Sequence, residues 1–158
     1  MTPRQLARQQ IEELVQRYNT IDKAARPSLT EANVLHQFID PLLRALGWPI
    51  DDHNRCKYEL STQTGRPDIV LFPEAGGAVY VEAKRFGVID KLEQSRNRLE
   101  GILTPGQLSL PGMAADRTAE EQQAINYAFS NGGTWAIMTN FERLRLFNAR
   151  RDWLVLAF

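Results

Sequence analysis

The chain has 158 residues, 43% of them hydrophobic and 24% charged, which is the composition of one globular domain with a buried core. Its 19 basic and 19 acidic residues cancel, so the overall charge does not indicate a nucleic-acid partner, and affinity for DNA must come from local basic clusters. The single cysteine, Cys56, excludes an internal disulfide and a cysteine-based metal site.

The absence of a secretory signal and of a membrane-length apolar run predicts a cytoplasmic protein without membrane contact. The sequence ends on an apolar, strand-like run, Trp153 to Phe158. Because such a run needs a partner, we expect a domain that belongs to a longer protein.

The first predicted helix runs from Pro3 to about Tyr18, where apolar residues recur near helical spacing. A second helix is predicted to begin near Ser28, which forms a capping-box pattern with Glu31, or at the alternative cap Thr30. Gly47 is its natural end. Pro41 lies inside this helix and predicts a kink or break near Asp40.

Three strands should follow the polar turn 51–54: Cys56 to Leu60, then two apolar runs, 69–72 and 78–83, joined by the turn 73–77. Side chains alternate along a strand, so Glu82 and Lys84 should point the same way. If the last two strands pair in the antiparallel sense, Asp68 lies near both of them.

These three side chains suggest a specific chemistry. Two neighbouring carboxylates repel each other unless a cation lies between them, and carboxylate oxygens are ligands that magnesium prefers. A lysine beside them can hold the attacking water or stabilise charge on a phosphate. Asp68, Glu82 and Lys84 therefore predict a site that cleaves phosphodiester bonds, although so short a pattern also occurs by chance as solvated strand-end charges.

The region after Lys84 is predicted to contain a charged helix over 90–103, within an insertion spanning 86–117 that is broken by two Pro-Gly pairs. Loops this long are uncommon unless they are functional or mobile. The insertion could be a lid, a DNA-facing element or disordered sequence, and its role stays open.

A second capping box, Thr118 with Glu121, predicts a helix to about Asn131, followed by the stop Gly132-Gly133. Gln123 and Tyr127 lie four residues apart and should emerge together on one face. The buried face should consist of Ala124, Ile125, Ala128 and Phe129. Strands are predicted at 135–139, 144–147 and 153–156.

Two basic clusters could bind DNA or simply be solvated surface. The first cluster consists of Arg85, Lys91, Arg96 and Arg98. The second consists of Arg143, Arg145, Arg150 and Arg151.

Several motifs occur in the order typical of one enzyme family. They are Thr30-Glu31-Ala32-Asn33, Phe38 to Leu43, Leu46-Gly47-Trp48, Gly65-Arg66-Pro67-Asp68, Glu82-Ala83-Lys84-Arg85, Gln123-x-x-x-Tyr127, and 135–140 with 144–148. From about residue 28 to 150 the chain resembles the nuclease domain of type I restriction enzyme R subunits, which belong to the PD-(D/E)XK nuclease superfamily.

The resemblance implies an α/β fold with a mixed central β-sheet flanked by helices and a restriction-endonuclease-like αβββαβ core. Residues 28–158 would be the nuclease domain, and 1–27 an N-terminal helix extension. It implies a magnesium-dependent endonuclease, with Mn²⁺ as a substitute, that cuts double-stranded DNA in a restriction–modification enzyme. Helicase, methyltransferase or specificity domains would be its partners, in a type I R subunit or in a fused restriction–methyltransferase polypeptide.

When the family's motifs are matched to this sequence, the resemblance implies that Asp68 and Glu82 are magnesium ligands and that the Ala83 carbonyl completes the ligand shell. Lys84 would position the attacking water. Glu31 would be a supporting acid, although it could equally be a first-turn acid favoured by the helix dipole. Gln123 and Tyr127 would handle DNA or organise the site. The stretch between Lys84 and Gln123 is longer than the family usually has, which puts the position of their helix in doubt.

Two other interpretations stay open. A catalytically silent nuclease-like module could bind DNA or a partner subunit without cutting, although the intact set of Asp68, Glu82 and Lys84 argues against it. A structural α/β domain with a coincidental motif would not explain the ordered series.

Overall fold

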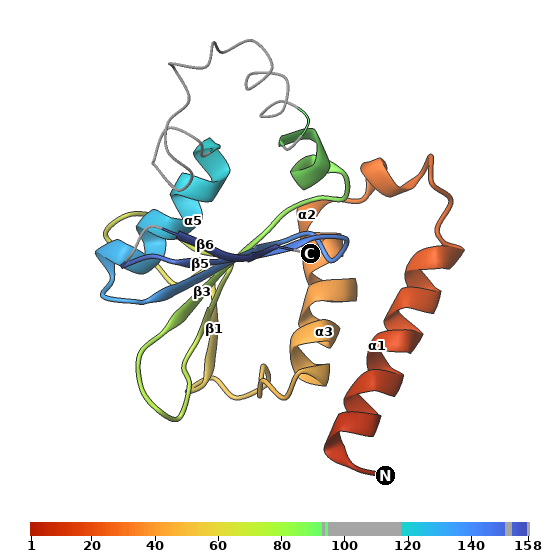
Figure 1. Cartoon of the computed structure of the whole chain (residues 1–158), viewed down its shortest axis with the longest axis horizontal. Coiled ribbons are helices and arrows are strands. Elements are labelled where there is room, and N and C mark those ends of the chain that lie inside the picture. The colour runs from red at the N-terminus through yellow and green to blue at the C-terminus, as the bar shows by residue number, and fades with distance from the viewer. Residues whose placement is uncertain (93, 95–117, 151–152, 158) are drawn as a thin grey trace.

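The computed structural model describes residues 1–92, 94, 118–150 and 153–157, and in these it has a mixed α/β fold (Figure 1). Six strands form one sheet in the order β1-β2-β3-β4-β5-β6. Neighbouring strands are antiparallel except β3 and β4, which are parallel. The strands are β1 (Cys56–Tyr58), β2 (Ile69–Leu71), β3 (Val79–Ala83), β4 (Trp135–Thr139), β5 (Leu144–Asn148) and β6 (Trp153–Ala157). The predicted α/β class with a mixed sheet is thus confirmed.

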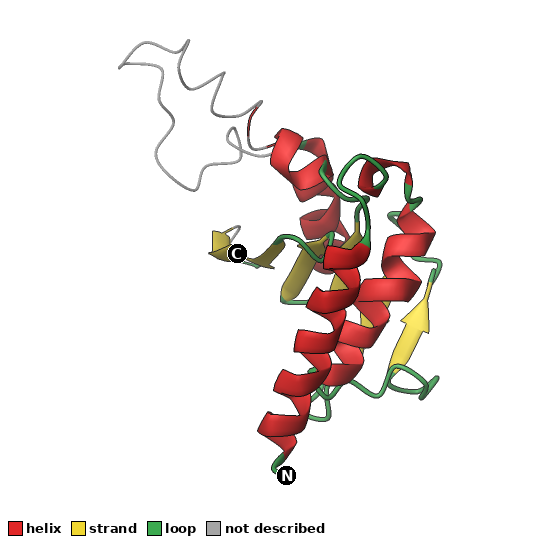
Figure 2. Ribbon diagram, turned by 90° about the vertical axis from the view of Figure 1, so that its right-hand side faces the viewer, coloured by secondary structure: helices red, strands yellow, loops and turns green. Residues whose placement is uncertain are grey.

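The first helix, α1 (Pro3–Thr20), begins at a capping box formed by Thr2 and Gln5. This capping box was not among the predicted helix starts. It packs beside α3 (Asp40–Ala45), as Figures 1 and 2 show. A short 3₁₀ turn, η1 (Arg26–Ser28), leads to the next helix.

The second helix begins at Thr30, whose hydroxyl accepts a hydrogen bond from the Asn33 amide. The capping box predicted for Ser28 and Glu31 is therefore wrong, because Ser28 belongs to η1 and Thr30, the alternative cap, is the one used. The helix continues as α2 (Glu31–Val34), a π-helical segment η2 (Leu35–Ile39) and α3.

The predicted irregularity at Pro41 takes the form of this widened π segment. Pro41 has no N–H for the carbonyl of Gln37, four residues earlier. Arg17 of α1 donates to that carbonyl instead, at 3.2 Å. The helix ends at Ala45 with Leu46 as its cap, and Gly47, the predicted stop, follows with a φ of +91°.

Two apolar clusters form the core, one on each face of the sheet. The cluster against α2–α3 contains Val34, Phe38, Ile39, Ile69, Leu71, Val81 and Phe86. The cluster beneath α5 (Ala119–Ser130) contains Val70, Tyr80, Ala124, Ile125, Ala128, Ala136, Met138 and Phe147. Because both faces of the sheet are covered, charged side chains that lie on it are poorly hydrated.

The helix α5 follows the predicted capping box of Thr118 and Glu121. Ala124, Ile125 and Ala128 are buried as expected, but Phe129 is 63% exposed, so its predicted burial is wrong. Beneath α5, Arg145 forms a buried ion pair with Glu121. Arg145 is only 2% exposed and therefore cannot belong to a basic surface cluster.

Residues 88–92 and 94 are helical, and the rest of the predicted charged helix and long loop lies outside the described residues. Within the described part of the chain, no helix has the length and apolar character needed to cross a bilayer.

We predict that Glu121→Gln lowers the free energy of unfolding by about 3 kcal/mol, because it removes the buried carboxylate that faces the Arg145 guanidinium. Thermal denaturation should show a melting temperature lower by about 10 °C. Glu120→Gln makes the same chemical change one residue earlier and is the control. Equal melting temperatures for the two variants would contradict the structural role of the buried pair.

Candidate active site

The β2–β3 hairpin carries the three residues that the sequence singled out. Its register pairs Ile69 with Val81, which places Asp68 next to Glu82 one residue further along. The antiparallel pairing on which the prediction depended is therefore confirmed. β3 is a central strand, paired with β2 on one side and β4 on the other. The end of β3 that carries Glu82 and Ala83 is therefore held within the sheet.

Asp68 is bound to the opposite strand by its side chain. Its Oδ2 atom accepts a hydrogen bond from the Ala83 amide at 2.7 Å. Burial raises the pKa of Asp68, and the hydrogen bond from Ala83 and the charge of Lys84 only partly oppose that effect. The carboxylate is thus fixed in place and destabilised in its charged form.

Glu82 and Lys84 point the same way, as alternation along the strand predicted. The Lys84 ammonium donates to Glu82 Oε1 at 2.7 Å, and the two side chains are only 11% and 7% exposed, respectively. The second oxygen, Glu82 Oε2, is buried without a hydrogen-bond partner. Burial raises the pKa of Glu82, although the ammonium opposes this.

The ammonium of Lys84 stays charged despite its burial. Burial lowers the pKa of Lys84, but the hydrogen bond to Glu82 and the nearby acids outweigh burial, so the net pKa is raised. Lys84 is therefore suited to donate hydrogen bonds and to stabilise negative charge, and it is poorly suited to act as a base.

Glu31, the first residue of α2, adds a third carboxylate to the group. Its Oε2 lies 3.9 Å from the Lys84 ammonium. Burial raises the pKa of Glu31, Lys84 lowers it, and Asp68 raises it further. The structure thus brings Glu31, Asp68, Glu82 and Lys84 together, with three carboxyl groups around one ammonium.

The donor set fits a hard divalent cation in part. Among the residues that the structure describes, no three acidic, histidine or cysteine side chains converge into a ready-made metal cage. The Lys84 ammonium occupies the space between Glu82 and Glu31. The pair Asp68 and Glu82 nevertheless offers carboxylate oxygens beside the Ala83 backbone, and the orphaned Glu82 Oε2 is a buried acceptor of the kind that a magnesium ion satisfies.

Gln123 and Tyr127 share a face of α5, and Gln123 donates to the Tyr127 hydroxyl at 2.7 Å. The prediction that both side chains are exposed on this face is wrong, because Tyr127 is only 6% exposed. Its ring packs against Gly65, where an added Cβ would lie 2.9 Å from the Tyr127 hydroxyl. No hydrogen bond within the described residues joins either side chain to the acids of the site.

This packing gives Tyr127 a role that sequence spacing did not reveal. Gly65 has a φ of +128°, which favours glycine, and it begins the segment that leads to Asp68. Asn131, four residues after Tyr127, donates to Thr64 at 3.4 Å. The α5 helix therefore holds the loop that precedes Asp68.

No protein-family model matches this chain, and neither the curated proteins nor the solved structures contain a significant match to it.

We predict that Asp68→Asn stabilises the protein at neutral pH in the absence of metal and DNA. The pKa of Asp68 is raised on folding, so its contribution to stability is complete below about pH 4 and is lost as the pH rises through the folded-state pKa. Asparagine can still accept from the Ala83 amide but carries no charge.

Melting temperatures measured from pH 4 to pH 8 should diverge as the pH rises, with the variant more stable by about 1 kcal/mol at pH 7. Glu74→Gln, on the exposed hairpin turn, is the control. A variant less stable than the wild type at pH 7 would show that the charged carboxylate stabilises the fold.

Proposed function

We propose that this chain is a magnesium-dependent endonuclease domain that hydrolyses phosphodiester bonds of double-stranded DNA, built on a restriction-endonuclease-like core. The observation that carries the proposal is the close grouping of Asp68, Glu82 and Lys84, in which Glu82 Oε2 is buried without a partner. A structural site would satisfy that oxygen, because an unpaired buried acceptor costs about 1–3 kcal/mol. A bound cation would offset this cost.

The order of the elements supports the same reading. The helix α2–α3 precedes β1, β2 and β3, and the crossover helix α5 leads to the parallel strand β4. The acids come from the two strands of the hairpin and from the start of α2, so they meet at one end of the sheet. The ordered motifs between residues 28 and 150 favour a restriction–modification enzyme as the context.

Each residue has a distinct task in this proposal. Asp68, Glu82 and the Ala83 carbonyl would hold the Mg²⁺ ion, which when bound would activate water and offset phosphate charge. Lys84 would orient the attacking water and donate to a phosphate oxygen, since its pKa is raised and it remains an ammonium. Glu31 would help to align the ammonium, which lies 3.9 Å from its Oε2 atom. Mn²⁺ would substitute for Mg²⁺.

Other domains would complete the enzyme. No surface helix of the described residues carries a row of basic side chains suited to the major groove. We therefore assign the choice of DNA sequence and movement along DNA to helicase, methyltransferase or specificity partners. Gln123 would reach the DNA from α5, while Tyr127 would act by holding the loop before Asp68.

Asp68→Ala and Lys84→Met should separate metal binding from catalysis. We expect Asp68→Ala to lose both the calorimetric binding of Mg²⁺ or Mn²⁺ and the nicking of plasmid DNA. Lys84→Met should reduce nicking at least about 100-fold, because the donor to water and phosphate is gone. Its metal affinity should be equal or tighter, because a positive charge beside Glu82 has been removed.

Glu74→Ala is the matched control, since it removes an exposed acid from the turn of the same hairpin. Metal binding without nicking by the wild type would mean that cutting requires the partner domains. A folded wild-type protein that binds neither metal alone nor metal with duplex DNA would contradict the proposal and favour a catalytically silent module.

A further inference from the structure

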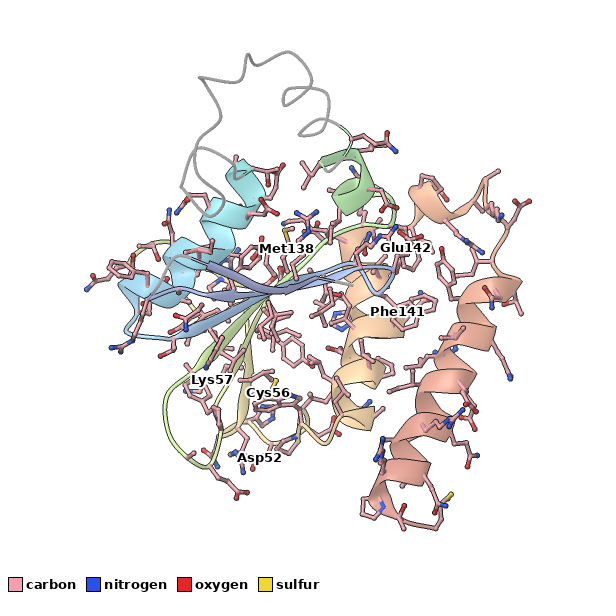
Figure 3. All side chains as sticks on the ribbon, in the orientation of Figure 1. Asp52, Cys56, Lys57, Met138, Phe141 and Glu142 are labelled. Atoms are coloured by element: carbon pink, nitrogen blue, oxygen red, sulfur yellow. The ribbon has the colours of Figure 1, made fainter. Side chains whose placement is uncertain are left out.

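The turn between β4 and β5 carries Phe141 and Glu142. Phe141 has a φ of +70°, a left-handed conformation that is unfavourable for a phenylalanine. Thr139 stabilises it, since its hydroxyl accepts from the Phe141 amide at 3.1 Å and donates to the Arg143 carbonyl at 2.8 Å. Figure 3 shows Phe141 and Glu142 at this turn, on the side where α1 lies. A strained turn with its own supporting bonds indicates that the position of Glu142 matters.

The Glu142 carboxylate accepts three hydrogen bonds, two of them from distant parts of the chain and one from its own turn. Tyr18 in α1 donates to Oε1 at 2.5 Å. The Gly87 amide and the Asn140 side chain donate to Oε2, at 2.9 Å and 3.1 Å. Glu142 thus joins the first helix to the backbone that follows Lys84.

That backbone depends on the turn. Residues 84–87 lie outside any strand, so their polar groups must find other partners. The Lys84 amide donates to the Thr139 carbonyl at 2.9 Å, and the Asn140 side chain reaches the Arg85 carbonyl at 3.5 Å. Together with the bond from Gly87 to Glu142, these contacts fix the path of the chain immediately after Lys84.

The α1 end of the connection is equally constrained. Arg26 donates to the Tyr18 hydroxyl at 2.6 Å, and its guanidinium lies 3.9 Å from the centre of the Tyr18 ring. The ring also meets Phe86, two residues after Lys84, edge-on at 5.3 Å. Burial and Glu142 raise the pKa of Tyr18, so its hydroxyl remains a donor.

We propose that Glu142 is a positioning residue that couples α1 to the candidate active site by fixing the backbone directly after Lys84. The structural coupling stands on the contacts alone, whereas its catalytic consequence rests on the proposed nuclease function. Anything that displaces α1 would loosen the segment that aims the Lys84 ammonium.

Tyr18→Phe is the main test, because it removes the hydroxyl and keeps the ring packing. Amide hydrogen exchange followed by NMR would be measured at Lys84 and Gly87, relative to Val81 in the core of β3. We expect exchange at both amides to rise about fivefold relative to Val81, the effect of weakening one hydrogen bond. Glu142→Ala should raise it further, and Glu74→Ala, which removes a glutamate from the other hairpin turn, should leave it unchanged.

Cleavage kinetics give a second readout. For a wild type that cuts DNA, Tyr18→Phe should lower kcat about fivefold and leave KM unchanged, because the positioning of Lys84 is affected and substrate binding is not. Unchanged exchange at Lys84 and Gly87 in both Tyr18→Phe and Glu142→Ala would overturn the coupling. A folded wild type that binds neither metal alone nor metal with duplex DNA would overturn the proposed function, and the exchange data would still decide the coupling.

Discussion

The candidate site depends on one backbone-anchored contact, the hydrogen bond from the Ala83 amide to the Asp68 carboxylate. This bond fixes one acid beside Glu82 at the end of a hairpin whose surroundings are apolar on both faces. Three carboxylates then share a single ammonium, and burial raises the pKa of each acid. Burying these carboxyl groups together lowers the stability of the fold. Such a loss is typical of functional sites, where a bound ligand restores the stability.

Elements distant in sequence hold this arrangement in place. The start of α2 contributes Glu31, and α5 secures the loop before Asp68 through the packing of Tyr127 on Gly65. The β4–β5 turn holds the chain after Lys84 through Glu142. The supports from α5 and from the β4–β5 turn fix backbone on either side of the hairpin, so they leave the acids and the lysine available for chemistry.

The sequence was informative where local rules decide the structure. Alternation along β3 predicted that Glu82 and Lys84 share a side, and the turn composition predicted the hairpin. Packing from distant segments decided the rest. The sequence suggests that Arg145 is a surface charge, but in the fold it pairs with the buried Glu121. The spacing suggests that Tyr127 is exposed beside Gln123, but in the fold its ring packs against Gly65. An acid in a turn, such as Glu142, carries no local signal of its two distant donors, Tyr18 and Gly87.

In the proposed function, a divalent cation binds between Asp68 and Glu82. Paramagnetic broadening by substoichiometric Mn²⁺, read from backbone NMR signals in the presence of duplex DNA, tests it most directly. We expect the signals of Asp68, Glu82, Ala83 and Lys84 to broaden first and to recover when excess Mg²⁺ is added. Broadening centred on the exposed acids of the 51–54 turn, or none in a folded protein, would contradict it.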